Sequence, residues 1–367
     1  MKSKVAFVKV KHEKNGVENA VKRAMKLANW KKHVKGKKLF VKINGISDQL
    51  VPGQCTSPWV IDAVLSELRK EFPKTDIKMG DANLAAAEQL NRAAKLWGFY
   101  ELADKYNAEF VNLSEQSLIK KDLKGLALRE VEVPKALLDA DTIVNLPVAK
   151  THCLTSITCC LKNHWGMLPR FRHQFHLVAN QAIPDVNHFF KKTTFNVVDA
   201  TVGMEGNAPR TGVPKIFDAV FAGNDRVAID SAVATLMSFD PRKVEHIVNA
   251  EKMGIGKIDF EIIGDKKEFK PVKVIVPEPN KQPIFLLEMS FRKTPILRTL
   301  IFKTKIFDFF AWGATQYNVL WWYNLYGKKY AKEIIDNTWY GNEFEELWER
   351  TGGTGKLGKS TFDFKCD

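Results

Sequence analysis

The stretch DADTIVNLPVAKTH (residues 139–152) decides the fold class. TIVNLP (142–147) is a short apolar run that contains β-branched residues, so it predicts a buried strand. KTH (150–152) follows after two further apolar residues and would present a cation and an imidazole where that strand ends. Six similar runs alternate with stretches whose apolar residues recur three and four apart, which is the signature of βαβ units. These six are VAFVKV (5–10), LFVKIN (39–44), DIKMG (76–80), AEFVNL (108–113), FNVVDA (195–200) and AVFAG (219–223).

This alternation predicts an α/β fold, with a mostly parallel sheet and helices on both of its faces. We expect that domain to span residues 1–265. A helical appendage rich in aromatic and basic residues would follow over 266–350, and a flexible tail over 351–367. The helix after the second strand should begin at Ser57-Pro58, because a capping residue precedes a proline at the first helical position.

Several predicted strands end in a polar residue. In open parallel sheets, ligands bind just beyond the carboxyl ends of the strands. For any one of these residues the alternative is a helix cap. Five of them at one edge of a sheet predict a binding site there: Asn44, Asp81, Asn112, Asn145 and Asp199.

A basic cluster follows the strand at 142–147. Five of the eight histidines fall between residues 152 and 188, close to two lysines and two arginines, which predicts a site for an anionic ligand or a metal–cofactor adduct. LTSITCCLKN (154–163) is expected to run as a buried helix that returns Lys162 to the sheet edge. Apolar surroundings there would lower the pKa of Lys162 and make it a nucleophile or a base. The cluster comprises His152, His164, His173, His176, His188, Lys150, Lys162, Arg170 and Arg172.

The five cysteines do not form an extracellular disulfide framework, because they are few and clustered. Residues 1–16 carry no apolar run of the secretory type, so we expect a cytoplasmic protein. Cys153, Cys159 and Cys160 lack CxxC spacing, so no iron–sulfur cluster is expected. We expect these three side chains to pack as small buried groups.

The net charge of +14 is unevenly distributed. Residues 1–50 carry 14 Lys and Arg against three acids, but without interleaved aromatics, which favours a solvated face over nucleic-acid binding. Residues 281–335 carry nine Lys and Arg against three acidic residues, among many aromatic residues. That segment has three interpretations: packing on the main domain or on a second copy in a homo-oligomer, contact with an anionic membrane surface, or a spanning helix. Its Trp, Tyr and Lys content suits an interface better than a span.

Motifs along residues 5–265 resemble the DUF362 family of archaeal and bacterial proteins, which has no settled common activity. They include GDAN (80–83), DADTIVNLPVAKTH (139–152), LKNHWGMLPR (161–170) and DRVAIDSAVATLMSFDP (225–241). The chain departs from the family at Lys42-Ile43-Asn44, where the family usually has Lys-Pro-Asn. It also lacks the ferredoxin-like cysteine module that many members carry.

The pattern is also similar to the nickel-pincer lactate racemase family, in which a histidine after a "DAD" strand is followed ten residues later by a lysine. In that family the lysine holds a pyridinium-derived cofactor, and histidines act as nickel ligand or acid/base. The resemblance therefore implies a divalent metal, nickel or zinc, or a lysine-linked cofactor. His152 and His176 would be the metal-binding histidines. Asp81 stands where an early catalytic histidine would be expected.

These residues predict an enzyme that transfers a proton or a hydride on a small carboxylate. Lys162, His152 and Asp81 would be catalytic. The alternative is a membrane-peripheral or partner-binding accessory protein without catalysis. The anionic ligand would be bound by Lys42, Asn44, Thr56, Lys150, Asn163, Arg170 and Asp199.

Overall fold

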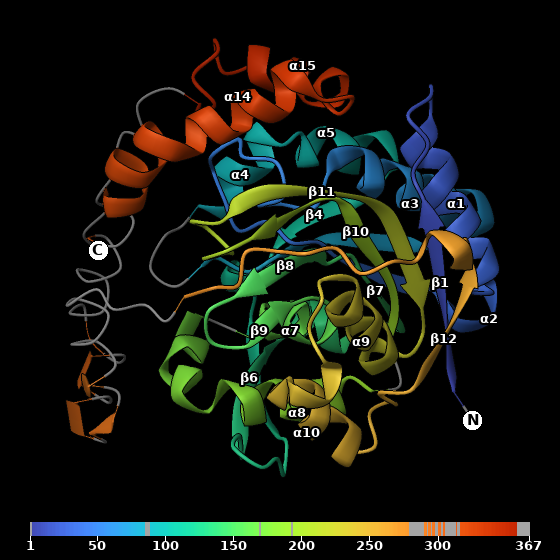
Figure 1. Ribbon diagram of the computed structural model, residues 1–367. Coiled ribbons are helices and arrows are strands. Elements are labelled where there is room, and N and C mark those ends of the chain that lie inside the picture. Colours follow the sequence, from blue (N-terminus) through green and yellow to red (C-terminus); the bar gives the residue numbers. More distant parts are fainter. Residues whose placement is uncertain are drawn as a thin grey trace.

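A computed structural model shows a large mixed sheet between two layers of helices (Figure 1). The structure describes residues 2–84, 89–168, 170–191, 194–278 and 317–357, together with isolated residues between 290 and 316. The main path of the sheet has the order β12-β1-β11-β10-β7-β2-β3-β4, and β8 joins it through β10 and carries β9. The strands are β1 Ser3–Lys9, β2 Lys38–Lys42, β3 Asp76–Asp81, β4 Glu109–Asn112, β7 Thr142–Asn145, β8 Val148–His152, β9 Ser156–Thr158, β10 Thr194–Glu205, β11 Val213–Gly223 and β12 Phe260–Gly264.

Helices cover both faces of the sheet because successive strand residues point to opposite sides. In β2, Phe40 packs into one core, while Leu39 and Val41 pack into the other. The first core contains α6 Lys135–Leu138, α7 Cys160–Trp165, α8 Ala179–Phe189, α9 Arg226–Leu236 and α10 Glu245–Lys252. The second contains α1 Gly16–Leu27, α2 Trp30–His33, α3 Pro58–Glu71, α4 Leu90–Leu96, α5 Phe99–Lys105, α14 Lys328–Asn337 and α15 Gly341–Glu349.

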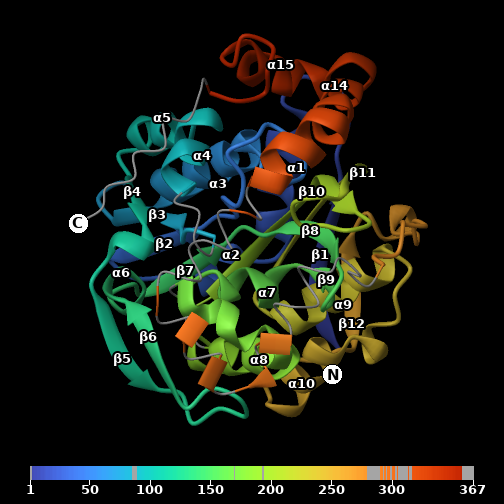
Figure 2. The same cartoon turned by 90° about the vertical axis from the view of Figure 1, so that its left-hand side faces the viewer.

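All seven predicted strands are present, and the mostly parallel α/β fold is confirmed. Strands β2, β3, β4, β7 and β10 form a continuous parallel block. The long strands β10 and β11 pair antiparallel, and β1 also runs antiparallel to β11. A separate hairpin of β5 Leu118–Asp122 and β6 Glu130–Pro134 lies beside the helices of the first core (Figure 2).

Residues 154–163 do not form the single buried helix that the composition predicts. Ser156–Thr158 is strand β9, which pairs antiparallel with β8, and helix α7 begins only at Cys160. The tight return after β8 passes through Ser156, whose φ is 60°. Isoleucine and threonine at 157 and 158 favour extended backbone, so the strand extends to the residue before the two cysteines.

The chain after 316 packs part of its aromatic residues on the main domain. Phe344 of α15 is fully buried, and its ring lies 4.6 Å from the Trp59 ring and 6.2 Å from the Trp97 ring. The π-helical segment η5 Tyr317–Gly327 buries Trp322 and Tyr323 against residues that include Val51 and Met204. Figure 1 shows α14 and α15 side by side at one end of the molecule, and Tyr340, between them, donates to Asp218 of β11 at 3.0 Å. Among the described residues, no helix combines the length and apolar character that a membrane crossing requires.

Part of the C-terminal region lies beyond what the structure describes. Most of residues 279–316 belong to that part, so the prediction for 281–335 can be followed only from 317 onward. In the predicted tail, residues 351–357 are bonded to the fold, since Leu50 N–H donates to the Gly355 carbonyl at 2.8 Å. Residues 358–367 lie outside the described chain.

Candidate functional site

A buried ion pair stands at the carboxyl ends of β2 and β3. Lys42 Nζ lies 2.6 Å from Asp81 Oδ1, and the two side chains are 0% and 4% exposed. The Asp81 carboxylate also accepts the N–H groups of Gly45 and Ala82, at 2.9 and 2.7 Å. Gly166 closes over the pair, because a Cβ on it would lie 3.0 Å from Asp81 Oδ1 and 3.1 Å from Lys42 Nζ. The predicted catalytic Asp81 is thus held by the protein, with Lys42 as its counter-ion.

Lys150 enters the same edge of the sheet from β8 and is completely buried. Its Nζ donates to Asn44 Oδ1 at 2.6 Å and to the Gln54 carbonyl at 2.5 Å. Burial lowers the pKa of Lys150 to about 7, although Cys55, Asp199 and Asp81 act in the opposite direction. Lys150 and Asn44, both predicted as ligand-binding residues, are therefore brought together.

Two other predicted ligand-binding residues position helix α3. Asp199 Oδ2 accepts the Ser57 N–H at 2.8 Å, and Oδ1 accepts the Thr201 hydroxyl at 2.6 Å. Helix α3 begins at Pro58 as predicted, but the Ser57 side chain makes no capping hydrogen bond. Asp199 instead lies at the start of this helix, where a negative charge is favoured. Thr56 Oγ1 donates to the Leu146 carbonyl at 2.7 Å and accepts the Asn44 N–H at 2.9 Å. The predicted end of the strand at residue 200 was wrong, because β10 continues to Glu205.

Asparagine side chains link the strand ends to helix α7. Asn163 Nδ2 donates to Asn145 Oδ1 at 2.8 Å, and Asn145 Nδ2 donates to Asn196 Oδ1 at 3.0 Å. Asn163 Oδ1 also lies 3.5 Å from Lys42 Nζ. Asn112 is the last residue of β4 and lies opposite Asp81, so it stands at the predicted edge. Its Oδ1 accepts the Ser114 N–H at 3.1 Å and starts a short helical turn there.

Lys162 and His152 form the second part of the site, where β8 ends and α7 begins. Burial lowers the pKa of Lys162 to about 7, and the positive charges of Lys150 and Arg172 act in the same direction. The side chain is nevertheless partly exposed, and its closest polar contact given by the structure is Thr158 Oγ1 at 3.5 Å. Within the described residues Lys162 makes no ion pair with a carboxylate. The described structure therefore gives its amine no carboxylate to balance its charge.

The tautomer of His152 follows from its contact with the backbone. The Leu154 N–H donates to His152 Nδ1 at 3.0 Å, so the proton of the neutral ring belongs on Nε2. Burial, followed by the charge of Lys162, lowers the pKa of His152 well below its usual value. His152 thus presents an N–H donor on its Nε2 side.

Two further residues, His246 and Arg172, were not among the predicted catalytic, ligand-binding or metal-binding residues. His246 on α10 is fully buried, and burial together with the charge of Lys162 lowers its pKa to about 3. Arg172 is also buried and donates to the carbonyls of Leu168 and Asn83. The sequence signal for Arg172 was its place in the basic cluster, whereas His246 stands alone in an amphipathic helix and gave none. The side chain of Arg170, predicted to bind the ligand, lies outside the described part.

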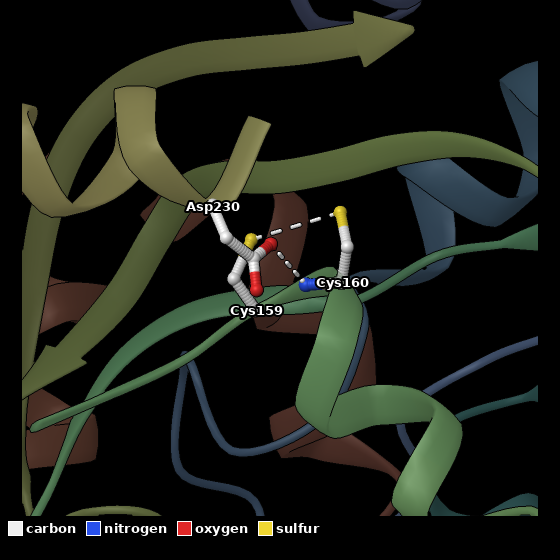
Figure 3. Close-up of side chains that lie close together, drawn as sticks. All are labelled: Cys159, Cys160 and Asp230. Carbon is white, nitrogen blue, oxygen red and sulfur yellow. Dashed lines mark hydrogen bonds between the residues drawn. The ribbon is translucent and has the colours of Figure 1, made fainter. Parts of the chain in front are cut away.

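One group of described residues has the donor types of a metal site. Cys159 Sγ, Cys160 Sγ and a carboxylate oxygen of Asp230 lie within 4.8 Å of one another, and all three residues are buried (Figure 3). Asp230 also accepts the N–H groups of Cys160 and Leu161, at 2.7 and 3.0 Å, which satisfies the start of α7. Burial raises the pKa of Asp230 to about 7 and that of Cys160 to about 11. The group could hold a metal ion only after losing thiol protons that burial retains.

The hydrogen bonds of His152 and His176 test whether these two residues could hold the predicted metal ion. A histidine ligand needs an unprotonated ring nitrogen. His176 Nδ1 lies 2.8 Å from the His173 carbonyl, which places its proton on Nδ1 and suits ligation through Nε2. His152 has the opposite arrangement, because its Nδ1 lone pair is used and Nε2 carries the proton. The two histidines as placed do not fit one metal ion.

A surface hollow lies elsewhere, between α1, α2 and α3. It measures about 750 Å³ and is lined mainly by basic side chains, including Lys22 and Lys31. Those two lysines already pair with Glu18 and Glu71. We therefore place the candidate site at the sheet edge, where the amines are buried, and not in this hollow.

The fold and the buried lysines define an α/β protein with a basic, amine-bearing edge on a mostly parallel sheet. Residues 39–235, more than half of the chain, match the model of the domain of unknown function DUF362, and the chain belongs to that family.

A curated relative is the thylakoid-associated protein sll1697 of Synechocystis sp. It is 24% identical over 183 residues, which cover 47% of this chain and 55% of that protein. The chain thus spans about half the length of this relative. Among solved structures, the lactate racemase apoprotein of Thermoanaerobacterium thermosaccharolyticum is similar with a TM-score of 0.40 and 17% identity, covering 69% of this chain and 57% of that one. A Thermotoga maritima protein has a TM-score of 0.35 and 15% identity, covering 56% and 55%.

Proposed function

We propose that this chain is a cytoplasmic enzyme that binds a small anionic carboxylate beside Lys162 and transfers a proton or a hydride there. The observation that carries the proposal is the state of Lys162. Its side chain is half-buried, its surroundings lower the pKa of the amine to about 7, and it makes no ion pair with a carboxylate among the described residues. An amine in such surroundings is available as a nucleophile or a base near neutral pH.

The other predicted residues take roles that agree with this proposal. Lys150 and Arg172 supply positive charge beside the amine, and these cations would attract the carboxylate. His152 supplies an N–H donor through Nε2. The Lys42–Asp81 pair and Asn163 hold helix α7 against the strand ends. Their hydrogen bonds within the protein suit positioning better than direct contact with a substrate.

Binding of anions to purified full-length protein tests the proposal. Calorimetry with pyruvate, L-lactate and oxalate should detect a complex that weakens about tenfold or more in Lys162→Ala and His152→Ala, because each variant removes a charged or polar contact. Lys32→Ala removes an exposed lysine on α2 and should leave binding unchanged. If both site variants bind all three anions as the wild type does, the proposal is wrong.

Intact-mass and metal analysis of natively purified protein tests the cofactor prediction. A mass adduct that maps to Lys162, or stoichiometric nickel or zinc, would support the lysine-linked or metal-dependent form of the enzyme. A bare, metal-free chain that still binds anions would leave Lys162 and His152 as the reacting groups. Metal bound to a Cys159→Ser variant as tightly as to the wild type would place the ion away from Cys159.

We also propose attachment to an anionic membrane surface, because η5 has an exposed apolar side. Leu320, Trp321, Leu325 and Tyr326 are 64, 57, 52 and 47% exposed, while Trp322 and Tyr323 point into the fold. Lysines 328, 329 and 332 follow directly on α14. Exposed aromatic residues beside lysines are typical of proteins that lie on a membrane interface. The name of the cyanobacterial relative, a thylakoid-associated protein, agrees with this second role.

Flotation with vesicles that contain anionic lipid distinguishes the second role from the first. Wild-type protein should float, and added salt should reduce flotation. Trp321→Ser/Leu325→Ser should remain with the unbound protein. Leu126→Ser is the matched control, since Leu126 is 67% exposed in the β5–β6 connection. Equal flotation of the double variant and the wild type would contradict attachment through η5.

A further inference from the structure

We infer that Cys159, Cys160 and Asp230 bind a zinc ion, which joins the start of α7 to α9. This site is separate from the metal predicted at His152 and His176. It also goes beyond the proposed function, because none of the three residues takes part in the proposed reaction. The donors are two thiol sulfurs and a carboxylate oxygen. These are atom types that zinc binds in proteins.

The spacing of the donor atoms matches a single tetrahedral ion. The Cys159 and Cys160 sulfurs lie 3.9 Å apart, and a carboxylate oxygen of Asp230 lies within 4.8 Å of both (Figure 3). Two thiolates bound at about 2.3 Å to one tetrahedral zinc ion are separated by about 3.8 Å. The two sulfurs therefore stand at the distance that a shared ion requires. Three protein donors leave the fourth position of the ion to a water molecule or another small ligand.

The junction between β9 and α7 brings the two sulfurs together. Adjacent side chains of a strand point to opposite faces, and those of a helix are rotated by about 100°. Cys159 follows β9, which ends at Thr158, and Cys160 is the first residue of α7. The backbone thus changes conformation between the two cysteines, and their sulfurs can approach one ion from neighbouring positions in the chain.

The Asp230 carboxylate is held in place by backbone groups and still has lone pairs for a metal. Its Oδ1 accepts the Cys160 N–H at 2.7 Å, and its Oδ2 accepts the Leu161 N–H at 3.0 Å. A carboxylate oxygen has two acceptor positions, so each oxygen keeps one after these bonds. Hydrogen bonds that orient a ligating carboxylate are typical of metal sites. Asp230 lies 70 residues after Cys160, so a shared ion would link two distant segments of the chain.

A buried arginine supplies the opposite charge to Asp230. Arg226 lies one turn before Asp230 on α9, is 2% exposed and forms no ion pair in the part of the chain that the structure describes. Its guanidinium donates instead to His164 Nδ1 at 2.9 Å and to the Lys191 carbonyl at 3.0 Å. His164 in turn lies one turn after Cys160 on α7. The contact between α7 and α9 therefore contains one cation and one acid, with no net charge when Asp230 is ionised.

The exchange of protons for a divalent ion preserves this balance. When a zinc ion binds, each Zn–S bond replaces an S–H bond, and two protons leave to the solvent. Two positive charges are replaced by two, so the buried region gains no net charge. A monovalent ion in the same exchange would leave one uncompensated negative charge, which is costly away from water. The charges therefore favour zinc over monovalent copper, which also binds thiolates.

Titration of the full-length protein with cobalt tests the inference. Co²⁺ bound to thiolates gives a sulfur-to-metal charge-transfer band in the near ultraviolet, so it reports on the ligands directly. Reduced, metal-free wild type should develop this band with one ion per chain, and added Zn²⁺ should abolish it. Because the three residues are buried, the metal is added both to the folded protein and during refolding from urea. Calorimetry near pH 8 in buffers of different ionisation enthalpy should count about two protons released for each zinc ion.

Single substitutions assign the metal to these residues. Cys160→Ser should lower the zinc affinity by at least about a hundredfold, because even changes to the outer shell of a metal site cost about 10–100-fold. Cys159→Ser should act in the same way. Cys55→Ser is the matched control, since Cys55 is equally buried but belongs to no group of metal-binding donors among the described residues. Circular dichroism verifies that each variant is folded.

The outcomes separate this site from the proposed function. His152→Ala should bind zinc as the wild type does, because His152 is not a ligand of this ion. Absence of the cobalt band in both preparations would overturn the inference, and so would equal zinc affinity of Cys160→Ser and the wild type. Zinc binding without proton release would also overturn it, since the thiols would then have kept their protons. Zinc that depends on His152 but not on Cys160 would overturn it and would favour the metal-dependent form of the proposed enzyme.

Discussion

At the scale of single residues, three lysines lie near the same edge of the sheet and differ in the partners of their amines. Lys42 is paired with Asp81, and Lys150 is bonded to neutral oxygens. Lys162 has neither a close carboxylate nor a short bond among the described residues. Burying a cation without an opposite charge is costly, and natural proteins accept that cost mainly where the group acts. This contrast is why the proposed function centres on Lys162.

The lowered pKa of Lys162 should make the stability of the protein depend on pH. Its pKa is about 7 in the folded chain and about 10.4 when unfolded, so between these values the unfolded chain binds more protons. The contribution of Lys162 to folding stability therefore becomes more favourable as pH rises from 7 to 10. Lys162→Met should be more stable than the wild type at pH 6.5, by about 1 kcal/mol or more, and should lose that advantage by pH 10. Urea denaturation of both proteins at pH 6.5 and at pH 10 measures the free energies of unfolding.

Lys32→Met, on an exposed lysine, serves as the control for this comparison and should give no difference that varies with pH. A constant difference between wild type and Lys162→Met across the pH range would show that Lys162 titrates alike in the folded and unfolded chains.

Gly166 allows a second test, because its constraint is steric and not conformational. Its φ of −65° is available to any residue, but an added Cβ would lie about 3 Å from both members of the Lys42–Asp81 pair. Gly166→Ala should lower the free energy of unfolding by about 1–3 kcal/mol, as overpacking of a core does. Gly313→Ala, whose Cβ would meet nothing within 4 Å, should have little effect. An equal effect in both variants would mean that the ion pair moves aside freely.

At the scale of elements, local pattern predicted the strands but not the contacts between distant ones. The runs at 39–44, 76–80 and 142–147 are short and apolar, so their strands and polar ends could be read directly. Strand β9 was missed because it is three residues long, too short to show a period. The capping of α7 by Asp230 and the burial of His246 depend on how α9 and α10 pack. No spacing within either helix encodes that packing.

Helix α15 was predicted as part of an appendage, yet its packing shows how closely it is joined to the domain. Phe344 lies between Trp59 of α3 and Trp97, which follows α4. Phe344→Ala should lower the free energy of unfolding by about 3–5 kcal/mol, since a fully buried aromatic ring is lost. Hydrogen exchange should then become faster along 341–349 before the central strands are affected. Tyr326→Ala, on the exposed side of η5, should change stability by less than about 0.5 kcal/mol.

At the scale of the whole molecule, the sheet and the C-terminal helices share one core. Ile334, Tyr340, Phe344 and Leu347 belong to the same apolar cluster as the helices that cover β2 and β3. The division at 265–266 predicted from composition therefore separates segments whose apolar side chains pack together. The sequence showed the change in composition correctly, but composition cannot show that a helix late in the chain returns to cover an early one.

A chain that ends at residue 278 should make this dependence measurable. It keeps every strand of the described sheet but exposes Trp59 and Trp97 to water, because the side chains that cover them are gone. Each buried side chain lost removes about 1.5–3 kcal/mol, so the thermal midpoint should fall by about 10 °C or more in calorimetry. An unchanged midpoint would mean that the C-terminal helices add no net stability. The truncated chain cannot test membrane attachment, because its newly exposed Trp59 and Trp97 would themselves bind vesicles. Attachment is therefore tested with point variants on η5.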